Sequence, residues 1–465
     1  MAYVRGDKAQ FDAWEELGNP GWSWEELWPY FKNVEKMFAP EPWQVDLGAS
    51  MKRENHGSDG DMHESWAALG LLSANDNMNG GCTRGFEVCP QTIDPVVNQR
   101  WDAASAFLWP VADRRNLHLI NGTAPRATWA SDKTNQDGNE YPRASGVKYM
   151  TPDQQVRTIS ASREVILSAG TFRTPLILER SGVGNRRLLE KLDIDVVVDL
   201  PGVGEDLVDQ TNTPFMFKTS RDLHGGSPFV LSVTAADLFG ANTSHIAAET
   251  RRSLHQWAKQ VAEANAGMQH GLIFNKGVTL AEIFTTTYAG TVVTTAANLS
   301  PFSRGSIHLQ SSSGTTDADV RPAIDPKYLP VSIDMETQVA VGRLASFLLH
   351  MPPLHVLVVG DLLPPDDVDG STPPPRADAE DAGWRAWTAD ALSSNWHSMG
   401  TASMMARELG GVVDARFRVY GTRGLRVVDA SIMPTQLSGH PMATFYAIAD
   451  RASEMFLSDA VKDSK

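Results

Sequence analysis

The sequence predicts a mixed α/β (α+β) protein divided into more than one domain. A chain of 465 residues can bury a large core and usually folds as two domains or more. Residues 162–170 have the pattern of a buried strand that ends in a small-residue turn and leads into a helix. Residues 442–456 carry apolar side chains at steps of three and four, the pattern of an amphipathic helix. Strands and helices are therefore expected in the same fold.

The other elements follow from local patterns of apolar residues and turn formers. Ser23 is a capping residue with Glu26 three positions later, so a helix is expected from Ser23 to Met37. Residues 40–90 and 352–375 are rich in Pro, Asp and other turn formers and are expected to form loops. Further helices are expected at residues 98–107, 247–266, 334–350 and 384–391. Strands are expected at residues 116–120, 147–150, 156–159, 292–295 and 306–309.

The charge balance argues against two classes of partner. The chain has 41 Lys and Arg against 56 Asp and Glu, which gives a net charge of −15. An acidic chain without a basic patch is poorly suited to bind nucleic acid or an anionic membrane. No apolar run approaches the roughly 20 residues that span a bilayer, and the first residues lack the apolar core of a signal peptide. We therefore expect no nucleic acid or membrane partner, and no signal peptide in this sequence.

The two cysteines, Cys82 and Cys89, do not match the spacing of a metal-binding framework. They either close one short disulfide or remain isolated thiols, and we expect no metal site. Glycosylation triplets begin at Asn121, Asn242 and Asn298, but they are acceptors only if the chain is secreted.

A histidine at position 440 lies at the start of the last helix. Pro441 follows it directly, and proline is favoured at the first helical position because its missing N–H costs nothing there. His440 therefore stands at the positive end of a helix dipole, beside backbone N–H groups that stabilise an anion. A flavin reduced by two electrons is one such anion. The alternative is an ordinary cap before a buried helix.

A longer pattern around this histidine resembles the C-terminal signature of the glucose–methanol–choline (GMC) oxidoreductases. It begins at Asn395-Trp396-His397 and ends at Gly439-His440, with its motifs in the family's order. Within the family, the sequence is most similar to fungal glucose oxidases and FAD-dependent glucose dehydrogenases. Residues 162–184 resemble the family's second signature. The motifs between the two ends are Gly400-Thr401, Gly411–Asp414, Arg418–Gly421, Leu425–Ser431 and Pro434-Thr435.

The resemblance implies the FAD-binding GMC fold, which has a discontinuous flavin domain and a substrate domain built on an antiparallel sheet capped by helices. The strands at 292–295 and 306–309 should belong to this sheet. The sequence contains no Gly-x-Gly-x-x-Gly, the loop that brings a dinucleotide pyrophosphate onto a helix N-terminus. We therefore expect the family's N-terminal dinucleotide-binding βαβ unit to be missing. The implied regions are a flavin-domain remainder at 1–210 with lid loops at about 40–95, a substrate-binding domain at 211–385, and a catalytic and flavin-binding segment at 386–465.

The resemblance also implies FAD-dependent oxidation of an alcohol CH–OH group. The hydroxyl proton needs a base whose pKa lies near the working pH, and neutral imidazole meets this need. The resemblance assigns the base to His397 and places His440 on the substrate oxygen, so the two rings should meet over the flavin. Oxygen or another acceptor would then receive the electrons. The residues expected to contact FAD are Trp396, Asp429, Ala430, His440 and Met442, and those expected to contact substrate are Ser393, Asn395 and Trp396.

Two positions depart from the family's sugar-oxidising members, which carry Arg where this sequence has Ser393 and Trp where it has Ala297. The loss of a guanidinium fork and an aromatic wall removes two groups suited to gripping a pyranose. We therefore expect a non-glucose alcohol of secondary metabolism as substrate. The alternatives are a sugar oxidase or dehydrogenase, a non-redox cyclase on the same scaffold, and an inactive truncated fragment. Family resemblance also implies a secreted glycoprotein.

Overall fold

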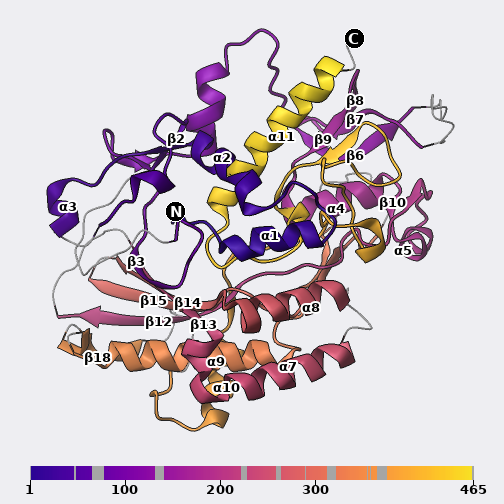
Figure 1. Cartoon of the computed structure of the whole chain (residues 1–465). Helices are drawn as coiled ribbons and strands as arrows, with labels where there is room; N and C mark the ends of the chain where they lie inside the picture. Colours follow the sequence, from indigo (N-terminus) through magenta and orange to yellow (C-terminus); the bar gives the residue numbers. More distant parts are fainter. Residues whose placement is uncertain are drawn as a thin grey trace.

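An antiparallel sheet divides the computed structural model into two layers, with α7, α9 and α10 below the sheet and α4 and α11 above it (Figure 1). The lower layer includes α7 (Thr243–Trp257), α9 (Ser332–Leu349) and α10 (Asp381–Ala391), and the upper layer includes α4 (Gly170–Arg180) and α11 (Met442–Lys462). The structure describes residues 2–46, 49–64, 78–130, 141–220, 228–257, 263–288, 290–311, 321–352, 354–356, 358–363 and 374–462.

The main sheet joins strands that are far apart in the sequence. Within the described residues it has seven strands, in the order β18-β12-β15-β14-β13-β3, with β19 also paired to β12. Every pairing in it is antiparallel. Threonine and valine fill much of β14 and β15, because branched side chains pack well on a pleated surface. The strands are β3 (Gly85–Val88), β12 (Thr211–Thr219), β13 (Phe229–Thr234), β14 (Thr279–Tyr288), β15 (Thr291–Asn298), β18 (Val358–Leu363) and β19 (Ser393–Ser394).

The lower face of this sheet packs against α9 and α10. Alternate strand residues point to this face, so Phe215, Ile283 and Ala296 are buried together with Trp384 of α10. Gly342 of α9 makes the close packing possible, because a Cβ at this position would lie 3.0 Å from the Trp384 ring. The remaining alternate residues of the sheet face the upper layer. The short helices beside this region are α6 (Ala235–Phe239) and α8 (Glu263–Gly271).

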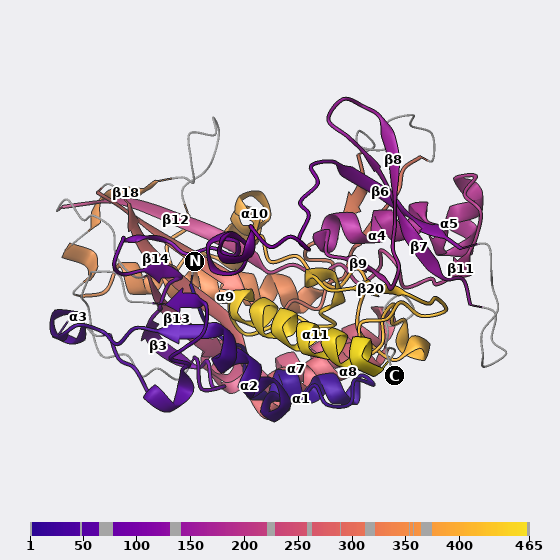
Figure 2. The ribbon, with the colours of Figure 1, turned by 90° about the horizontal axis from the view of Figure 1, so that it is seen from above.

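The upper layer combines short strands with helices from both ends of the chain. Strand β9 (Val165–Leu167) pairs in parallel with β20 (Leu425–Val427). Helix α11 lies beside α2 (Trp24–Val34) (Figure 2). Asn33 of α2 donates a hydrogen bond to Asp450 of α11 at 2.8 Å. One apolar core joins these elements. The other helices here are α1 (Lys8–Glu16), α3 (Pro42–Asp46) and α5 (Arg186–Lys191). A three-stranded sheet consists of β6 (Thr123–Trp129), β7 (Ala144–Met150) and β8 (Val156–Ser160). The remaining strands form two-stranded sheets: β1 (Glu35–Met37) with β2 (Met62–Glu64), β4 (Ile93–Asp94) with β5 (Gln99–Arg100), β10 (Val183–Gly184) with β11 (Val198–Asp199), and β16 (Ser306–His308) with β17 (Ala323–Asp325).

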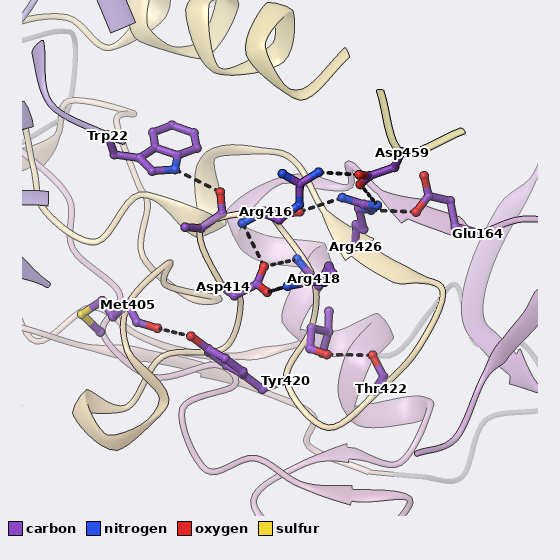
Figure 3. Close-up of polar contacts among 12 residues, drawn as sticks. Trp22, Glu164, Met405, Asp414, Arg416, Arg418, Tyr420, Thr422, Arg426 and Asp459 are labelled. Atoms are coloured by element: carbon purple, nitrogen blue, oxygen red, sulfur yellow. Dashed lines mark hydrogen bonds and ion pairs between the residues drawn. The ribbon is translucent and has the colours of Figure 1, made fainter. Parts of the chain in front are cut away.

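An ion-pair network holds the far end of α11 against β20. Arg426 of β20 donates to Glu164 at 2.6 Å and to Asp459 of α11 at 2.8 Å, and Arg416 donates to Asp459 at 2.5 Å (Figure 3). The hydrogen bond from Arg416, together with Arg426, lowers the pKa of Asp459 to about 2. The long helix is therefore fixed to the strand that leads into the Asp429–Ala430 segment.

Several predicted elements are confirmed. The Ser23 hydroxyl accepts a hydrogen bond from the Glu26 N–H at 3.4 Å, and the helix that it caps is α2, which ends at Val34. Residues Glu35–Met37, which were expected to continue this helix, form β1 instead. The helices expected at 334–350 and 384–391 are α9 and α10, and the strands at 147–150 and 156–159 are β7 and β8. The helix expected at 247–266 is represented by α7 and α8, and residues 258–262 between them lie outside the described part.

Other predictions are wrong. Residues 116–120 form no strand; Leu119 and Ile120 are exposed, and the alternating pattern there has no partner strand among the described residues. The expected helix at 98–107 is instead a single π-helical turn at Ala104–Leu108. The expected loop at 352–375 contains β18. The strand expected at 306–309 is present as β16, but it pairs with β17 outside the main sheet to which it was assigned. The lid loops expected at about 40–95 lie partly outside the described residues, and their role stays a prediction.

Three further observations concern the whole described chain. Cys82 and Cys89 are both free thiols, the first exposed and the second buried, so the pair is not joined in a disulfide. None of the helices in the described ranges combines the length and apolar character that a bilayer crossing requires. No cluster of His, Cys, Asp or Glu among the described residues could hold a metal ion, and the expected absence of a metal site stays a prediction.

Candidate active site

The segment around His397 is fixed between the two layers. The His397 N–H donates to Asp209 at 3.0 Å, and the His397 carbonyl accepts from Gln436 at 2.7 Å. Thr171, in the first turn of α4, donates to the carbonyl of Ser398 at 2.7 Å. Contacts from different elements therefore hold the backbone on both sides of the histidine.

The His397 and His440 rings, 43 positions apart in the sequence, meet in the structure. Their ring centroids are 4.9 Å apart and their planes cross at 79°, an edge-to-face arrangement. His440 precedes α11, which begins at Met442, so the start of the last helix places this ring. The predicted meeting of the two imidazoles is confirmed.

An acidic residue of the main sheet holds His440 in place. Its Nε2 lies 3.0 Å from the carboxylate of Glu282 in β14, whose side chain is only 2% exposed. A carboxylate only accepts hydrogen bonds, so Nε2 of His440 carries a hydrogen. Phe284, two positions along the same strand, packs against the His440 ring with centroids 5.1 Å apart. The sheet thus fixes both the position and the hydrogen-bonding direction of His440.

His397 is electrically neutral near neutral pH. Burial lowers the pKa of His397 well below its ordinary value of 6.5, and the neighbouring His440 lowers it further. A neutral imidazole has a free lone pair and can accept a proton. His397 can therefore act as a base without first losing a proton.

A row of side chains crosses the sheet beneath these histidines. In the strand register, Asn212 lies opposite Ala297, and Ala297 lies opposite Glu282, so their side chains share one sheet face. Ser393 pairs with Asn212 at the other end of the row and donates to its side chain at 2.9 Å. Asn212 in turn donates to Asn395 at 3.1 Å. Both positions at which the sequence departs from the sugar-oxidising members, Ser393 and Ala297, therefore belong to one row.

The carboxylate of Asp429 holds protein groups. One of its oxygens accepts from the Gly170 N–H at 3.0 Å and from Thr174 at 2.6 Å, and the other accepts from the N–H and hydroxyl of Ser431. These contacts join the end of β20 to the start of α4. Ala430, the next residue, is partly exposed.

The other residues predicted to bind FAD leave accessible surface. Trp396 is 87% exposed and has a φ of +56°, which is unusual for a bulky residue and is a mark of functional sites. Ala430 and Met442 are partly exposed. Gly170 begins α4 with a φ of +78°, and no atom lies within 4 Å of the position that its Cβ would take. An exposed aromatic ring, apolar side chains and open space at a helix N-terminus fit a flat ring system that carries phosphates.

Two residues of this site carry no role in the sequence-based prediction. Gln210 contacts the His397 ring at 2.6 Å, and Glu282 contacts His440. The available signal for Glu282 was an acid inside an otherwise apolar and threonine-rich strand, Thr279–Tyr288. No comparable signal marked Gln210, because its contacts depend on the register of the strand that follows it.

Comparison with known families gives two matches. The N-terminal model of the family described as GMC oxidoreductase matches residues 1–212, and the C-terminal model of the same family matches residues 301–449. The first match contradicts the expectation that the N-terminal unit is missing. That expectation relied on one short glycine motif, whereas the family model matches a pattern spread over the whole N-terminal region.

Individual proteins give the same result. A glucose oxidase-like protein of Humicola fuscoatra, fsoC, is 39% identical over 485 residues, covering 98% of this chain and 80% of the relative. A glucose oxidase of Aspergillus carbonarius is 33% identical, covering 98% of this chain and 77% of the relative. Among solved structures, an FAD-dependent oxidoreductase from Chaetomium thermophilum superposes with a TM-score of 0.85 at 25% identity, covering 99% of this chain and 84% of that one.

Proposed function

The chain belongs to the GMC oxidoreductase family and is an FAD-dependent oxidoreductase, and from this premise we propose that it oxidises an alcohol CH–OH group with His397 as the general base. The observation that carries the proposal is the pair of imidazoles, His397 and His440, with ring centroids 4.9 Å apart. The lowered pKa of His397 supports its role, because the base must be neutral before the reaction.

The protein's own groups manage the proton and the alcohol oxygen. The alcohol loses a proton from oxygen and a hydride from carbon, which leaves a carbonyl product. Bound FAD supplies the acceptor for the hydride. His397 takes the proton, and His440, held through Nε2 by Glu282, hydrogen-bonds the substrate oxygen from its other ring nitrogen, Nδ1, when that nitrogen is protonated as well.

We assign the cofactor contacts residue by residue. Trp396, Ala430 and Met442 present accessible surface and would lie against FAD, together with the His440 ring. Asp429 acts by positioning, because its carboxylate oxygens hold the Gly170 turn and Ser431. The open space at Gly170 suits a phosphate at the N-terminus of α4.

The row beneath the histidines supports a substrate other than glucose. A serine at 393 and an alanine at 297 offer neither a charged fork nor an aromatic wall for a pyranose. Ser393 and Asn395 would contact the substrate together with Trp396. The substrate class that we propose is a small or weakly polar alcohol of secondary metabolism, with oxygen as the electron acceptor. A sugar oxidase is the second candidate, favoured by the names of the relatives.

Secretion is part of the proposal, by analogy with the relatives. Asn121 and Asn242 are exposed and could then carry glycans, whereas Asn298 is fully buried and could not.

The deciding experiment is an absorbance measurement without oxygen. The purified protein should show the spectrum of bound flavin, and this spectrum should bleach when a suitable alcohol is added from a panel that includes glucose. Bleaching by glucose alone would favour the sugar oxidase. Turnover of a substrate without bleaching would indicate the non-redox cyclase, and a protein that binds no flavin would overturn the proposal.

A further inference from the structure

We infer that Gln210 is a positioning residue that fixes the tautomer of His397, with the proton on Nδ1 and the lone pair on Nε2. The inference deepens the proposed function, on which its chemical meaning rests. Its starting point is the short contact of 2.6 Å between Nδ1 of His397 and Oε1 of Gln210. Gln210 itself is fully buried and directly precedes β12.

The amide of Gln210 has one permitted orientation. Its Nε2 lies 2.9 Å from the carbonyl oxygen of Leu437, 3.2 Å from that of Gly439 and 3.4 Å from that of Leu299. Carbonyl oxygens accept hydrogen bonds and cannot donate them, so the NH₂ group must face them. A flipped amide would place Oε1 against these acceptors and leave the NH₂ group without them. Oε1 therefore faces the histidine.

This orientation determines which nitrogen of His397 carries the proton. An amide oxygen is only an acceptor, so the contact with Oε1 requires an N–H at Nδ1. The Asn395 amide nitrogen lies 3.3 Å from this Oε1 and also 3.3 Å from Nδ1 of His397. It donates to Oε1, because Nδ1 is already engaged in the much shorter contact of 2.6 Å with Gln210. In a neutral imidazole with Nδ1–H, the lone pair lies on Nε2. The nitrogen able to take the substrate proton is therefore chosen by the protein before substrate binds.

The same side chain also connects the two histidines. The Gly439 carbonyl that accepts from Gln210 belongs to the residue directly before His440. Gln210 thus bonds to the His397 ring with one end of its amide and to the His440 loop with the other. A change at this position should alter the state of the His397 ring as well as its position.

The test is ¹⁵N NMR of the histidine side chains in the full chain, with the His397 signals identified from their loss in His397→Ala. The nitrogen shifts and couplings distinguish a protonated ring nitrogen from one with a lone pair, and the measurement needs no enzymatic turnover. We expect the Nδ1–H form in the unmodified protein. In Gln210→Met, which keeps the length of the side chain and removes the acceptor, the two tautomers should mix. The rate of flavin reduction should then fall between about 10-fold and 100-fold, with KM little changed.

A matched control is available in Gln436, which is as deeply buried and contacts His397 only through the backbone carbonyl, at 2.7 Å, among the contacts described. Gln436→Met should leave the His397 tautomer unchanged. An Nε2–H form in the unmodified protein would overturn the inference, and this measurement requires no variant to fold. An unchanged tautomer in Gln210→Met, or equal changes in both variants, would also overturn it. If His397 proves not to be the base, the activity result fails while the tautomer result stands, so the two proposals are tested separately.

Discussion

Glu282 accepts a hydrogen bond from Nε2 of His440 at 3.0 Å, although 158 positions separate the two residues. The acid comes from β14 of the main sheet, and the histidine comes from the loop before α11. The contact therefore joins the sheet to the upper layer beside the candidate base. Because the Glu282 side chain is almost completely buried, its charge is screened little by solvent.

We expect Glu282→Gln to slow flavin reduction by about 10-fold. The substitution keeps the size of the side chain but removes a charge-assisted hydrogen bond, which contributes roughly 1.5–3 kcal/mol. Rapid mixing without oxygen measures this rate directly. Glu282→Asp, which retains the charge at a shorter reach, should lose less activity. An unchanged rate in Glu282→Gln would show that the carboxylate does not orient His440 for the reaction.

His397→Ala should lower the rate of flavin reduction by at least about 10²-fold, the low end for loss of a general base. The reason is that no other neutral base lies against His440 among the described residues. The same rapid-mixing measurement tests this. His245→Ala provides the control, since His245 is exposed on α7 and should be replaceable without effect. A rate near that of the unmodified protein would exclude His397 as the base.

The pH dependence of flavin reduction should lack a change near pH 6.5, the ordinary pKa of histidine. Burial and the neighbouring His440 lower the pKa of His397 well below this value, so the base stays neutral as pH falls through 6.5. The rate should decline only at more acidic pH, where His397 takes up a proton. A profile of rate against pH, with substrate saturating, tests the expectation. A midpoint at or above pH 6.5 would contradict it.

His308 should stabilise the fold at neutral pH and lose this contribution in alkali. Burial alone would lower its pKa, but hydrogen bonds from the ring to Glu179 at 2.7 Å and Glu205 at 3.1 Å raise the pKa of His308 to about 9. Because the pKa of His308 is higher in the folded protein than in the unfolded chain, the protonated ring stabilises the fold. This contribution is complete below the unfolded pKa of 6.5 and disappears as the pH rises through 9. With allowance for solvent screening, we expect about 1–2 kcal/mol.

Urea unfolding at a series of pH values measures this contribution. The difference in free energy of unfolding between the unmodified protein and His308→Gln should be largest below pH 6.5 and shrink as the pH approaches 9. A difference that does not depend on pH would show that the ring acts through packing alone.

Ser393→Arg should improve the binding of a pyranose. Ser393 is exposed at the end of the row formed with Asn212 and Ala297, so a longer side chain can be accommodated without disturbing the core. A guanidinium can donate two parallel hydrogen bonds to neighbouring oxygens of the sugar. A gain of about 1 kcal/mol in binding free energy would lower KM for glucose about fivefold. Ser393→Lys adds the same charge without the fork and should give a smaller gain. If both variants leave KM for glucose unchanged, position 393 does not select the substrate.

Local sequence signals were sufficient to predict several helices, whose contacts lie between residues close together in the sequence. Pro441 and the apolar periodicity after it predicted α11. The meeting of the imidazoles was implied only by the resemblance of the motifs around His397 and Gly439-His440 to the GMC signature. The strand at 116–120 was wrong because alternation of apolar residues is not sufficient; a strand also needs a neighbour to pair with. Strand β18 was missed because its Pro- and Asp-rich surroundings are typical of a loop.

The contacts of Gln210 and Glu282 could not be predicted from the sequence for a related reason. Each depends on which residues of distant segments lie opposite it, and that is set by strand register and by the path of the Leu437–Gly439 loop. A buried glutamine has the same local pattern whether it fixes a tautomer or fills space.

The ion pairs of Arg426 and Arg416 with Asp459 fix the far end of α11. Asp459 lies 17 residues, or about 25 Å, along the helix from Met442, the first helical residue after the loop that carries His440. The orientation of the His440 ring toward His397 therefore depends on both ends of α11. A substitution at Arg416 or Arg426, far from both histidines, can therefore reach His440 through the helix.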